Sequence, residues 1–259
     1  MKLVMEPYQH LAEELVRFGK MMHHIGFVSG TDGNLSIRLD DENVLATPTC
    51  ISKGMMQASD MVVVDMQGRQ VRGERNVSSE IGMHLTIYRM RTDVAAIAHA
   101  HPCTATGFAA AGIALDKPIC SELVVSLGAI PLASYATPGT ADLSESLRPF
   151  IADYDAILMA NHGVVSYGKD LEDAYLKMET VEHFAKIMLV AHQLGGAQSL
   201  SKPDLRKLME ARTKYEGNRS TSKRPVGPVS LPEKSFESEE KEAAHAAQAG
   251  SYGVLSRKT

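Results

Sequence analysis

The chain has 259 residues and a mass of 28.1 kDa, which is enough for one large domain or two small ones with a substantial core. Its net charge is −4 and it contains no Trp, so neither charge nor aromatic content favours binding to nucleic acid. Three scattered cysteines do not fit a disulfide scaffold or a Cys-rich zinc module, and they suit a reducing cytoplasm, where we expect the protein.

Hydropathy patterns divide the chain into helices, strands and turns. Helices are expected where apolar residues recur every three or four positions, and strands where short apolar runs lie between turn residues. Helices are predicted over 6–25, 103–112, 169–194 and 203–213, and a further helix is predicted to begin at 78–80. Strands are predicted over 35–39, 44–47, 61–65, 94–101 and 155–160. The apolar segments 122–127 and 130–135 follow a turn-rich stretch.

The segment 215–259 differs in composition from the rest of the chain. It contains Pro225, Pro228 and Pro232, an acidic run at 237–242, and no Ile or Met. Such a segment cannot bury enough apolar area to offset the entropy lost on ordering. We therefore predict a domain over 1–214 and a polar C-terminal tail over 215–259 that is disordered or loosely docked.

The N-terminus shows no secretion signal, because acidic residues interrupt its apolar stretches. No window approaches the run of about 18 to 20 apolar residues that spans a bilayer. We expect no membrane partner.

His99 and His101 are two positions apart in the predicted strand 94–101. Alternate residues of a strand point to the same face, so the two imidazoles converge within reach of one metal ion. A pair of hydrogen-bonded histidines on an exposed face is the simpler alternative, but the flanking Ala98 and Ala100 indicate a buried strand, where two unpaired imidazoles are costly.

His162 follows the predicted strand 155–160, at a strand end where ligands and catalytic groups gather. Taken alone it is best explained as a loop histidine that caps the strand. Together with His99 and His101 it completes a set of three neutral ligands, which suits a catalytic divalent ion with at least one open position.

Glu80 and a set of small polar residues are the other candidates for chemistry. Glu80 opens a helix after Ser78 and Ser79, which are suitable N-caps, and it is either a capping carboxylate or a general base near the ion. Thr31 and Asn34 lie in the Gly-rich turn 29–34. Free N–H groups and hydroxyls at such a turn and at a helix N-terminus bind phosphate without Lys or Arg.

These motifs, in this order, resemble the class II aldolase/adducin family: G-T-D-G-N at 30–34, T-P-T at 47–49, S-S-E at 78–80, H-A-H at 99–101 and N-H-G at 161–163. The resemblance covers about residues 8 to 195. It implies an α/β fold of three layers, α/β/α, in which helices flank a central, largely antiparallel or mixed β-sheet. It also implies a homotetramer, commonly of C4 symmetry, with active sites between neighbouring subunits.

The resemblance further implies a role for each matching residue. The divalent ion, usually zinc, with Mn²⁺, Co²⁺ or Fe²⁺ as alternatives, would be held by His99, His101 and His162. Glu80 would be the acid/base residue. The reaction would be aldol cleavage of a phosphorylated ketose, a deoxy-ketose 1-phosphate such as fuculose or 5-deoxyribulose 1-phosphate, to dihydroxyacetone phosphate and an aldehyde. The substrate phosphate would be held by Thr31, Asn34, Thr49, Ser78 and Ser79.

Two positions depart from the aldolase pattern. Cys50 stands where an aldolase of the family has Gly after T-P-T, which affects the approach of the backbone to phosphate. Glu122 aligns with a Tyr that a neighbouring subunit supplies to the site, and it is therefore a candidate acid/base or substrate-contact residue.

Other activities of the family remain as alternatives. A metal-dependent decarboxylase uses the same ion to stabilise the carbanion left by loss of CO₂. A sugar-phosphate 4-epimerase is less favoured, because the acidic residue it needs is missing from 124–127. A non-catalytic adducin-like module ranks last, since this chain keeps all three histidines and Glu80.

Overall fold

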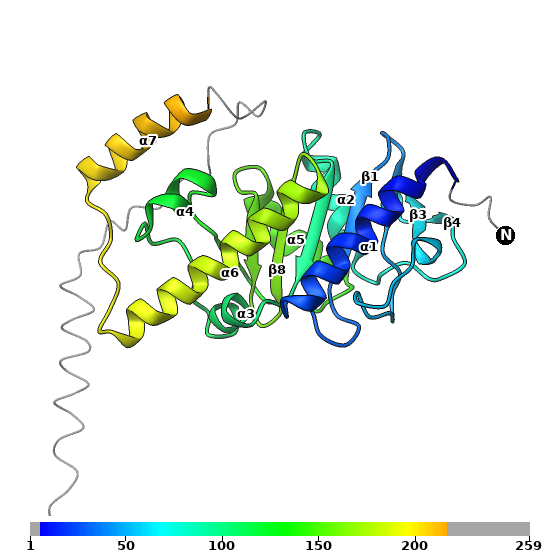
Figure 1. Ribbon diagram of the computed structural model, residues 1–259, viewed down its shortest axis with the longest axis horizontal. Helices are drawn as coiled ribbons and strands as arrows, with labels where there is room; N and C mark the ends of the chain where they lie inside the picture. The colour runs from blue at the N-terminus through cyan, green and yellow to red at the C-terminus, as the bar shows by residue number, and fades with distance from the viewer. Residues whose placement is uncertain (1–5, 217–259) are drawn as a thin grey trace, which may run out of the picture. The chain divides into compact units, whose positions relative to one another are not determined.

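An eight-stranded mixed sheet forms the centre of the computed structural model, which describes residues 6–216 (Figure 1). The strand order is β4-β3-β2-β1-β5-β8-β7-β6, and every neighbouring pair is antiparallel except β6 and β7, which are parallel. Both edge strands are short. The strands are β1 (Asn34–Arg38), β2 (Asn43–Ala46), β3 (Val62–Asp65), β4 (Gln70–Arg72), β5 (Ala96–Ala100), β6 (Leu132–Ala133), β7 (Ala156–Met159) and β8 (Gly163–Gly168).

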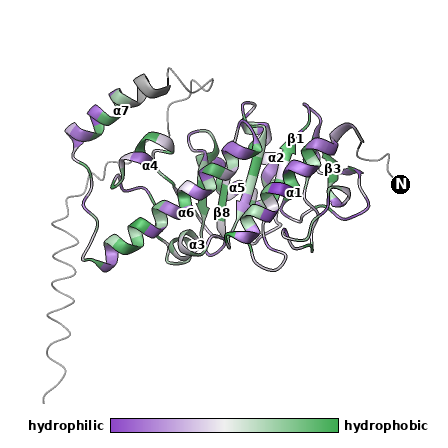
Figure 2. Ribbon diagram, viewed as in Figure 1, coloured by the Kyte–Doolittle hydropathy of each residue, from purple (hydrophilic) through white to green (hydrophobic). Residues whose placement is uncertain are grey.

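Helices cover both faces of this sheet, which confirms the predicted three-layer α/β fold. One core cluster joins the sheet to α1, α3 and α6, and a second joins the opposite face to α2 and α5. In Figure 2 the central strands are mostly green, whereas α1 and α6 carry both green and purple residues, as expected for helices with one buried face. The helices are α1 (Gln9–His24), α2 (Ile81–Met90), α3 (Cys103–Ala110), α4 (Ser121–Ser126), α5 (Ala141–Ile151), α6 (Leu171–Gln193) and α7 (Lys202–Glu216), with short 3₁₀ turns at Glu6–Tyr8 and Ala58–Asp60.

Alternation along β5 decides which side chains reach the site. Ala96, Ala98 and Ala100 pack in the cluster of α1, α3 and α6, whereas Ile97 packs in the cluster of α2 and α5. His99 shares the face of Ile97 and therefore points toward α2. Small side chains on one face let the helices approach closely while the other face carries the ligand.

The predicted elements differ from the structure at two functional positions. β5 ends at Ala100, so His101 lies one residue beyond the strand predicted over 94–101. The helix after Ser78 begins at Ile81, with Glu80 rather than a serine at the N-cap position and without a side-chain capping bond. The side chain of Glu80 is instead used by the site described below.

Strands β4 and β8 and helix α5 were not expected from the sequence. Leu143, Leu147 and Ile151 recur every four residues on α5 and pack with α2, which stabilises the helix although Pro149 lies inside it. Helix α7 extends to Glu216, past the predicted domain boundary at 214. The rest of the predicted tail lies outside the described residues. No helix in the described range 6–216 is long and apolar enough to cross a bilayer.

Candidate active site

Three histidines from two separate parts of the chain meet at the end of β5. Each of His99, His101 and His162 offers one ligand atom, and these atoms lie within 4.8 Å of one another. The ring centroids are 4.8 to 5.2 Å apart. His99 comes from β5, His101 from the residue after it, and His162 from the turn between β7 and β8, which is next to β5 in the sheet. The sequence prediction that these rings converge is therefore consistent with the structure.

The hydrogen bonds of these rings suit a divalent ion. The Nδ1–H of His99 donates to the Val164 carbonyl oxygen at 2.8 Å, which fixes the tautomer and leaves Nε2 free to bind a metal. Nε2 of His101 lies 3.2 Å from Nε2 of His99. The lone pairs of two ring nitrogens at this distance repel each other unless a cation or a proton lies between them. Burial and the charges of His99 and His162 lower the pKa of His101 to about 4, so its ring is neutral, as a ligand must be.

Glu80 lies among the three rings. Its carboxylate oxygens are 3.2 Å from Nε2 of His99 and 3.1 Å from Nε2 of His162, and Asn34 donates to it through Nδ2 at 2.8 Å. Burial alone would raise the pKa of Glu80, but the charges and hydrogen bonds of His99 and His162 outweigh it and hold this pKa well below its usual range. Glu80 is therefore a charged carboxylate next to the ligand set.

Two glycines allow the chain to approach this centre closely. A Cβ at Gly163 would lie 2.5 Å from Cδ2 of His101 and 2.6 Å from the Ala100 carbonyl oxygen. Gly33 has φ of 72°, and a Cβ there would lie 2.8 Å from the His99 carbonyl oxygen. The glycines of the G-T-D-G-N and N-H-G motifs thus leave room for the backbone and rings of the histidines.

The segments predicted to hold phosphate are brought together by backbone contacts. Pro48 forms an antiparallel bridge with Val77, and the Thr49 N–H donates to the Asn76 carbonyl oxygen at 2.9 Å. These contacts place the T-P-T loop beside the segment that leads to Ser78 and Ser79. The Gly-rich turn is joined to the T-P-T loop through a buried lysine, described below.

The predicted phosphate residues differ in exposure. Thr31 and Ser79 are exposed, and Thr49 is half-buried. Ser78 and Asn34 are buried, at 8% and 4% exposure. The amide of Asn34 is committed to Glu80, and its Oδ1 has no hydrogen-bond partner among the described residues. Asn34 thus connects the predicted phosphate site to the predicted acid/base residue.

The two departures from the family pattern have different outcomes. Cys50 adopts φ of 57°, the left-handed conformation that Gly favours, so the backbone keeps a glycine-like path at this point. Glu122 is an exposed residue of α4, where it accepts a hydrogen bond from Sγ of Cys120 at 3.1 Å. Among the described residues of one subunit, no hydrogen bond or ion pair joins Glu122 to the three histidines, so its catalytic role stays a prediction.

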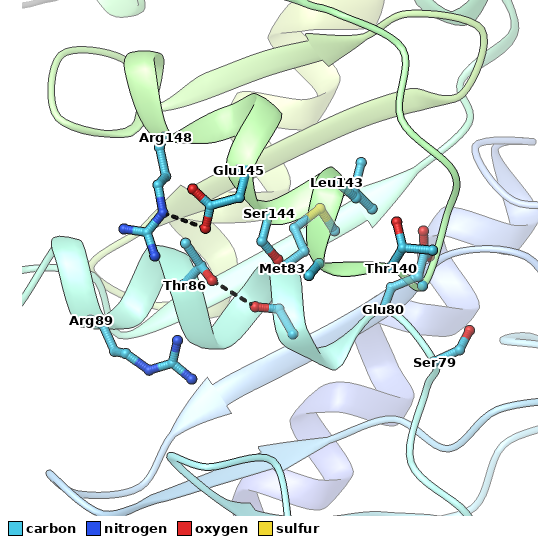
Figure 3. A pocket seen from close by; sticks show the side chains of 13 residues that line it. Ser79, Glu80, Met83, Thr86, Arg89, Thr140, Leu143, Ser144, Glu145 and Arg148 are labelled. Atoms are coloured by element: carbon cyan, nitrogen blue, oxygen red, sulfur yellow. Dashed lines mark hydrogen bonds and ion pairs between the residues drawn. The ribbon is translucent and has the colours of Figure 1, made fainter.

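A cavity of about 380 Å³ lies between α2 and α5, beside the predicted site (Figure 3). Ser79 and Glu80 line one part of it, and Arg89 and Arg148 line another. Arg89 donates to the Met66 carbonyl oxygen, and Arg148 pairs with Glu145. None of the three histidines lines this cavity, so it adjoins the ligand cluster without containing it.

Comparison with known families agrees with this geometry. The model of the Class II Aldolase and Adducin N-terminal domain matches residues 13–189. The chain belongs to this family. Members with curated aldolase names match at 30–33% identity, and the chain is accordingly an enzyme of the lyase class.

The names of several relatives of this chain state an activity. The 3-oxo-tetronate 4-phosphate decarboxylase of Pectobacterium atrosepticum is 35% identical over 187 residues, covering 70% of this chain and 85% of the relative. The 5-deoxy-D-ribulose 1-phosphate aldolase of Bacillus thuringiensis is 32% identical over 207 residues, covering 79% and 95%. A solved L-fuculose 1-phosphate aldolase has a TM-score of 0.71 at 33% identity and covers 78% of this chain and 95% of its own.

Sequence analysis missed three residues around the site. Asp32, inside the Gly-rich turn, places Oδ2 3.6 Å from Nδ1 of His101. Glu182 of α6 is 3% exposed and accepts hydrogen bonds from the N–H groups of Thr104 and Ala105, so it caps α3 directly after the ligand His101. Lys53, four residues after the T-P-T loop, is 1% exposed. The charge of Asp32 within the motif was a usable signal, whereas the other two depend on tertiary packing.

Proposed function

We propose that this chain catalyses the metal-dependent aldol cleavage of a phosphorylated ketose, a deoxy-ketose 1-phosphate such as fuculose or 5-deoxyribulose 1-phosphate. The products are dihydroxyacetone phosphate and an aldehyde. The observation that carries the proposal is Glu80, a carboxylate held among His99, His101 and His162 and joined through Asn34 to the predicted phosphate turn. An aldolase needs this combination of cation site, base and anion site.

The residues of this chain have defined tasks in such a reaction. A divalent ion bound to the three histidines, zinc in our proposal, would act as a Lewis acid on the oxygens of the substrate. When the C3–C4 bond breaks, its electron pair stays with C3, and the C4 hydroxyl loses its proton as the aldehyde forms. In the direction of cleavage Glu80 takes up a proton from water and passes it to C3, and in the direction of condensation its carboxylate removes the same proton. Glu122 of a neighbouring subunit is our candidate for the proton of the C4 hydroxyl.

The names of the relatives support a phosphorylated substrate. The Bacillus thuringiensis relative is a 5-deoxy-D-ribulose 1-phosphate aldolase, and a relative from Methanococcus maripaludis, 31% identical over 184 residues, is an L-fuculose phosphate aldolase. We further propose a cytoplasmic homotetramer in which neighbouring subunits complete each site.

A decarboxylase is the second candidate, favoured by the 35% identity to the 3-oxo-tetronate 4-phosphate decarboxylase. Loss of CO₂ also leaves an electron pair on the carbon next to a carbonyl group, so the same ligand set and the same proton donor apply. The two reactions differ in the bond that breaks and in the product that leaves.

A panel of substrates separates these activities. The zinc-loaded enzyme is incubated with ketose 1-phosphates and with 3-oxo acid phosphates, and dihydroxyacetone phosphate and CO₂ are measured. We expect dihydroxyacetone phosphate from at least one deoxy-ketose 1-phosphate. Release of CO₂ alone would establish the decarboxylase, and an enzyme that gains nothing from any divalent ion would contradict both.

Replacement of Glu80 tests its role directly. A Glu80→Gln variant keeps the size of the side chain and loses the base, so we expect bound zinc to persist while exchange of the dihydroxyacetone phosphate proton with solvent slows at least about 100-fold. Exchange is followed by NMR in D₂O, and zinc by metal analysis. Fast exchange in this variant would remove Glu80 from proton transfer.

A further inference from the structure

Lys53 is a buried cation that the proposed reaction does not use. Its side chain is 1% exposed, although lysine is among the residues least often buried. The segment around it packs against α1, because a Cβ at Gly19 would lie only 3.4 Å from the Lys53 carbonyl oxygen. The long aliphatic stem is thus enclosed, and its position is fixed by the fold.

The ammonium group joins two segments of the predicted phosphate site. Nζ donates to the Thr31 carbonyl oxygen at 3.1 Å and to the Ile51 carbonyl oxygen at 2.9 Å. Thr31 belongs to the Gly-rich turn, and Ile51 follows the T-P-T loop at 47–49. One ammonium proton remains without a hydrogen bond to the described residues.

The charge of Lys53 is poorly compensated. Within the described range, no carboxylate oxygen lies within 4.0 Å of its Nζ, and Asp32, whose charge acts on it, is half-exposed and faces His101. Burial lowers the pKa of Lys53 to about 8, against the charges of Asp32 and Cys50, which raise it. A buried ammonium without a close counter-charge is unfavourable unless an anion binds nearby.

We propose that Lys53 is a positioning residue for the phosphate group of the substrate, holding the Gly-rich turn and the T-P-T loop together and supplying the positive charge that the site otherwise lacks. The inference rests on the proposed phosphorylated substrate. In this proposal Lys53 does not bind the phosphate directly, because its Nζ is held by two backbone carbonyl oxygens. It acts through its charge and through the two carbonyl groups that it orients, which turns N–H groups of the loops toward the anion.

Phosphate binding is measured on the zinc-loaded, full-length protein, with inorganic phosphate as the probe. Lys53→Met removes the charge and both hydrogen bonds, Lys53→Gln removes the charge and keeps a donor, and Lys53→Arg keeps the charge. We expect Kd for phosphate to rise about tenfold or more in the two neutral variants, a change of about 1.4 kcal/mol, and to recover partly in the Arg variant. Lys20→Met, on the exposed side of α1, is the matched control and should bind phosphate as the wild type does.

A role in folding alone predicts a different result. It would lower the melting temperature of the neutral variants without changing their phosphate affinity, and it would alter binding of dihydroxyacetone and dihydroxyacetone phosphate equally. We expect the loss to be confined to the phosphorylated ligand and to appear in KM rather than kcat. Equal phosphate affinity of wild type and Lys53→Gln would overturn the inference.

The phosphate-binding test of Lys53 does not depend on which reaction the enzyme catalyses. An enzyme that cleaves no tested substrate but loses phosphate binding on substitution of Lys53 supports this inference and refutes the proposed function. A wild type that binds no phosphate refutes the inference. If Lys53→Met does not fold, the phosphate affinities of Lys53→Gln and Lys53→Arg are compared instead. If no variant folds, Lys53 is needed for folding and the inference is overturned.

Discussion

At the scale of single residues, Gly163 lies where a side chain would displace His101, one of the proposed metal ligands. The Cβ of Gly163→Ala would meet the His101 ring at 2.5 Å, so the ring has to move. We expect zinc affinity, measured by competition with a chelator, to fall about tenfold or more. A tenfold fall corresponds to a loss of only about 1.4 kcal/mol of binding free energy. Gly107→Ala on α3, with nothing within 4 Å, is the control. Unchanged zinc affinity in Gly163→Ala would show that the ring accommodates the methyl group.

Cys50 offers a test of backbone strain. Its left-handed conformation costs a non-glycine residue about 1 kcal/mol or more, which glycine does not incur. We expect Cys50→Gly to raise the free energy of unfolding by about 1 kcal/mol and to leave phosphate affinity unchanged. Cys50→Ala removes the thiol and keeps the strain, so its stability should match the wild type. Equal stability of both variants in urea titrations would contradict this account.

The sequence alone led to the proposed ligands and base, but not to the residues that support them. His99, His101 and Glu80 belong to motifs whose spacing already indicates chemistry. Lys53 and Glu182 look like surface charges in the sequence, and only the packing of α1 and α6 buries them. Their roles depend on contacts between distant segments, which no local pattern reveals.

At the scale of elements, periodicity predicted the central strands and the long helices but not α5 or β8. Strand β8 follows His162 directly, and its Gly163 and Gly168 weaken the β pattern. Helix α5 contains Ser and Pro, and it is stabilised mainly by contacts with α2. Both were missed because tertiary contacts, rather than local preference, decide them.

A cluster of charges links the ends of three elements. Arg91, 4% exposed, follows α2 and pairs with Asp155 at 2.8 Å, just before β7, and Lys177 of α6 lies 2.9 Å from the same carboxylate. Burial would raise the pKa of Asp155, but the charges and hydrogen bonds of Lys177 and Arg91 outweigh it and lower this pKa. The carboxylate therefore stabilises the fold in its charged form.

This cluster makes stability depend on pH. Because the pKa of Asp155 is lower in the folded chain, its contribution is present above the unfolded value of about 3.9 and is lost as the pH falls through the folded value. We expect Asp155→Asn to lower the free energy of unfolding by about 1 kcal/mol at pH 7, since the group is one-third exposed, and the difference from wild type to shrink as the pH falls below about 4. Urea titrations from pH 3 to pH 7 measure it. A difference that stays constant over this range would contradict the assignment.

At the scale of the whole molecule, the proposed tetramer can be tested by complementation. His99→Ala loses a ligand, and Glu122→Ala loses the residue that we assign to a neighbour's site. In randomly mixed rings, half of the sites have intact ligands and half of their neighbours supply Glu122, so about a quarter of the wild-type activity should return. Each variant alone should be inactive.

Activity is assayed after the two variants are unfolded together and refolded. A mixture of His99→Ala with Glu80→Ala is the control, because both residues belong to one subunit's site and mixing should restore nothing. No recovery in the first mixture would place Glu122 outside the active site.

The order of the strands could not be predicted from the sequence. β5 pairs with β1 and β8, which lie far from it along the chain, and this pairing brings His162 to His99 and His101. The family resemblance implied the three-layer fold and the convergence of these rings. Residue patterns alone could not supply that register, because it depends on which faces of distant segments are buried together.

The sheet ends in β4, with three residues, and β6, with two. Edge strands this short offer few unpaired backbone N–H and C=O groups. They are therefore poor templates for the addition of a strand from another chain and for fibril growth. In the proposed tetramer, subunits would therefore recognise one another through side chains on helices and loops. Charge substitutions on those surfaces should then separate an assembly into folded monomers.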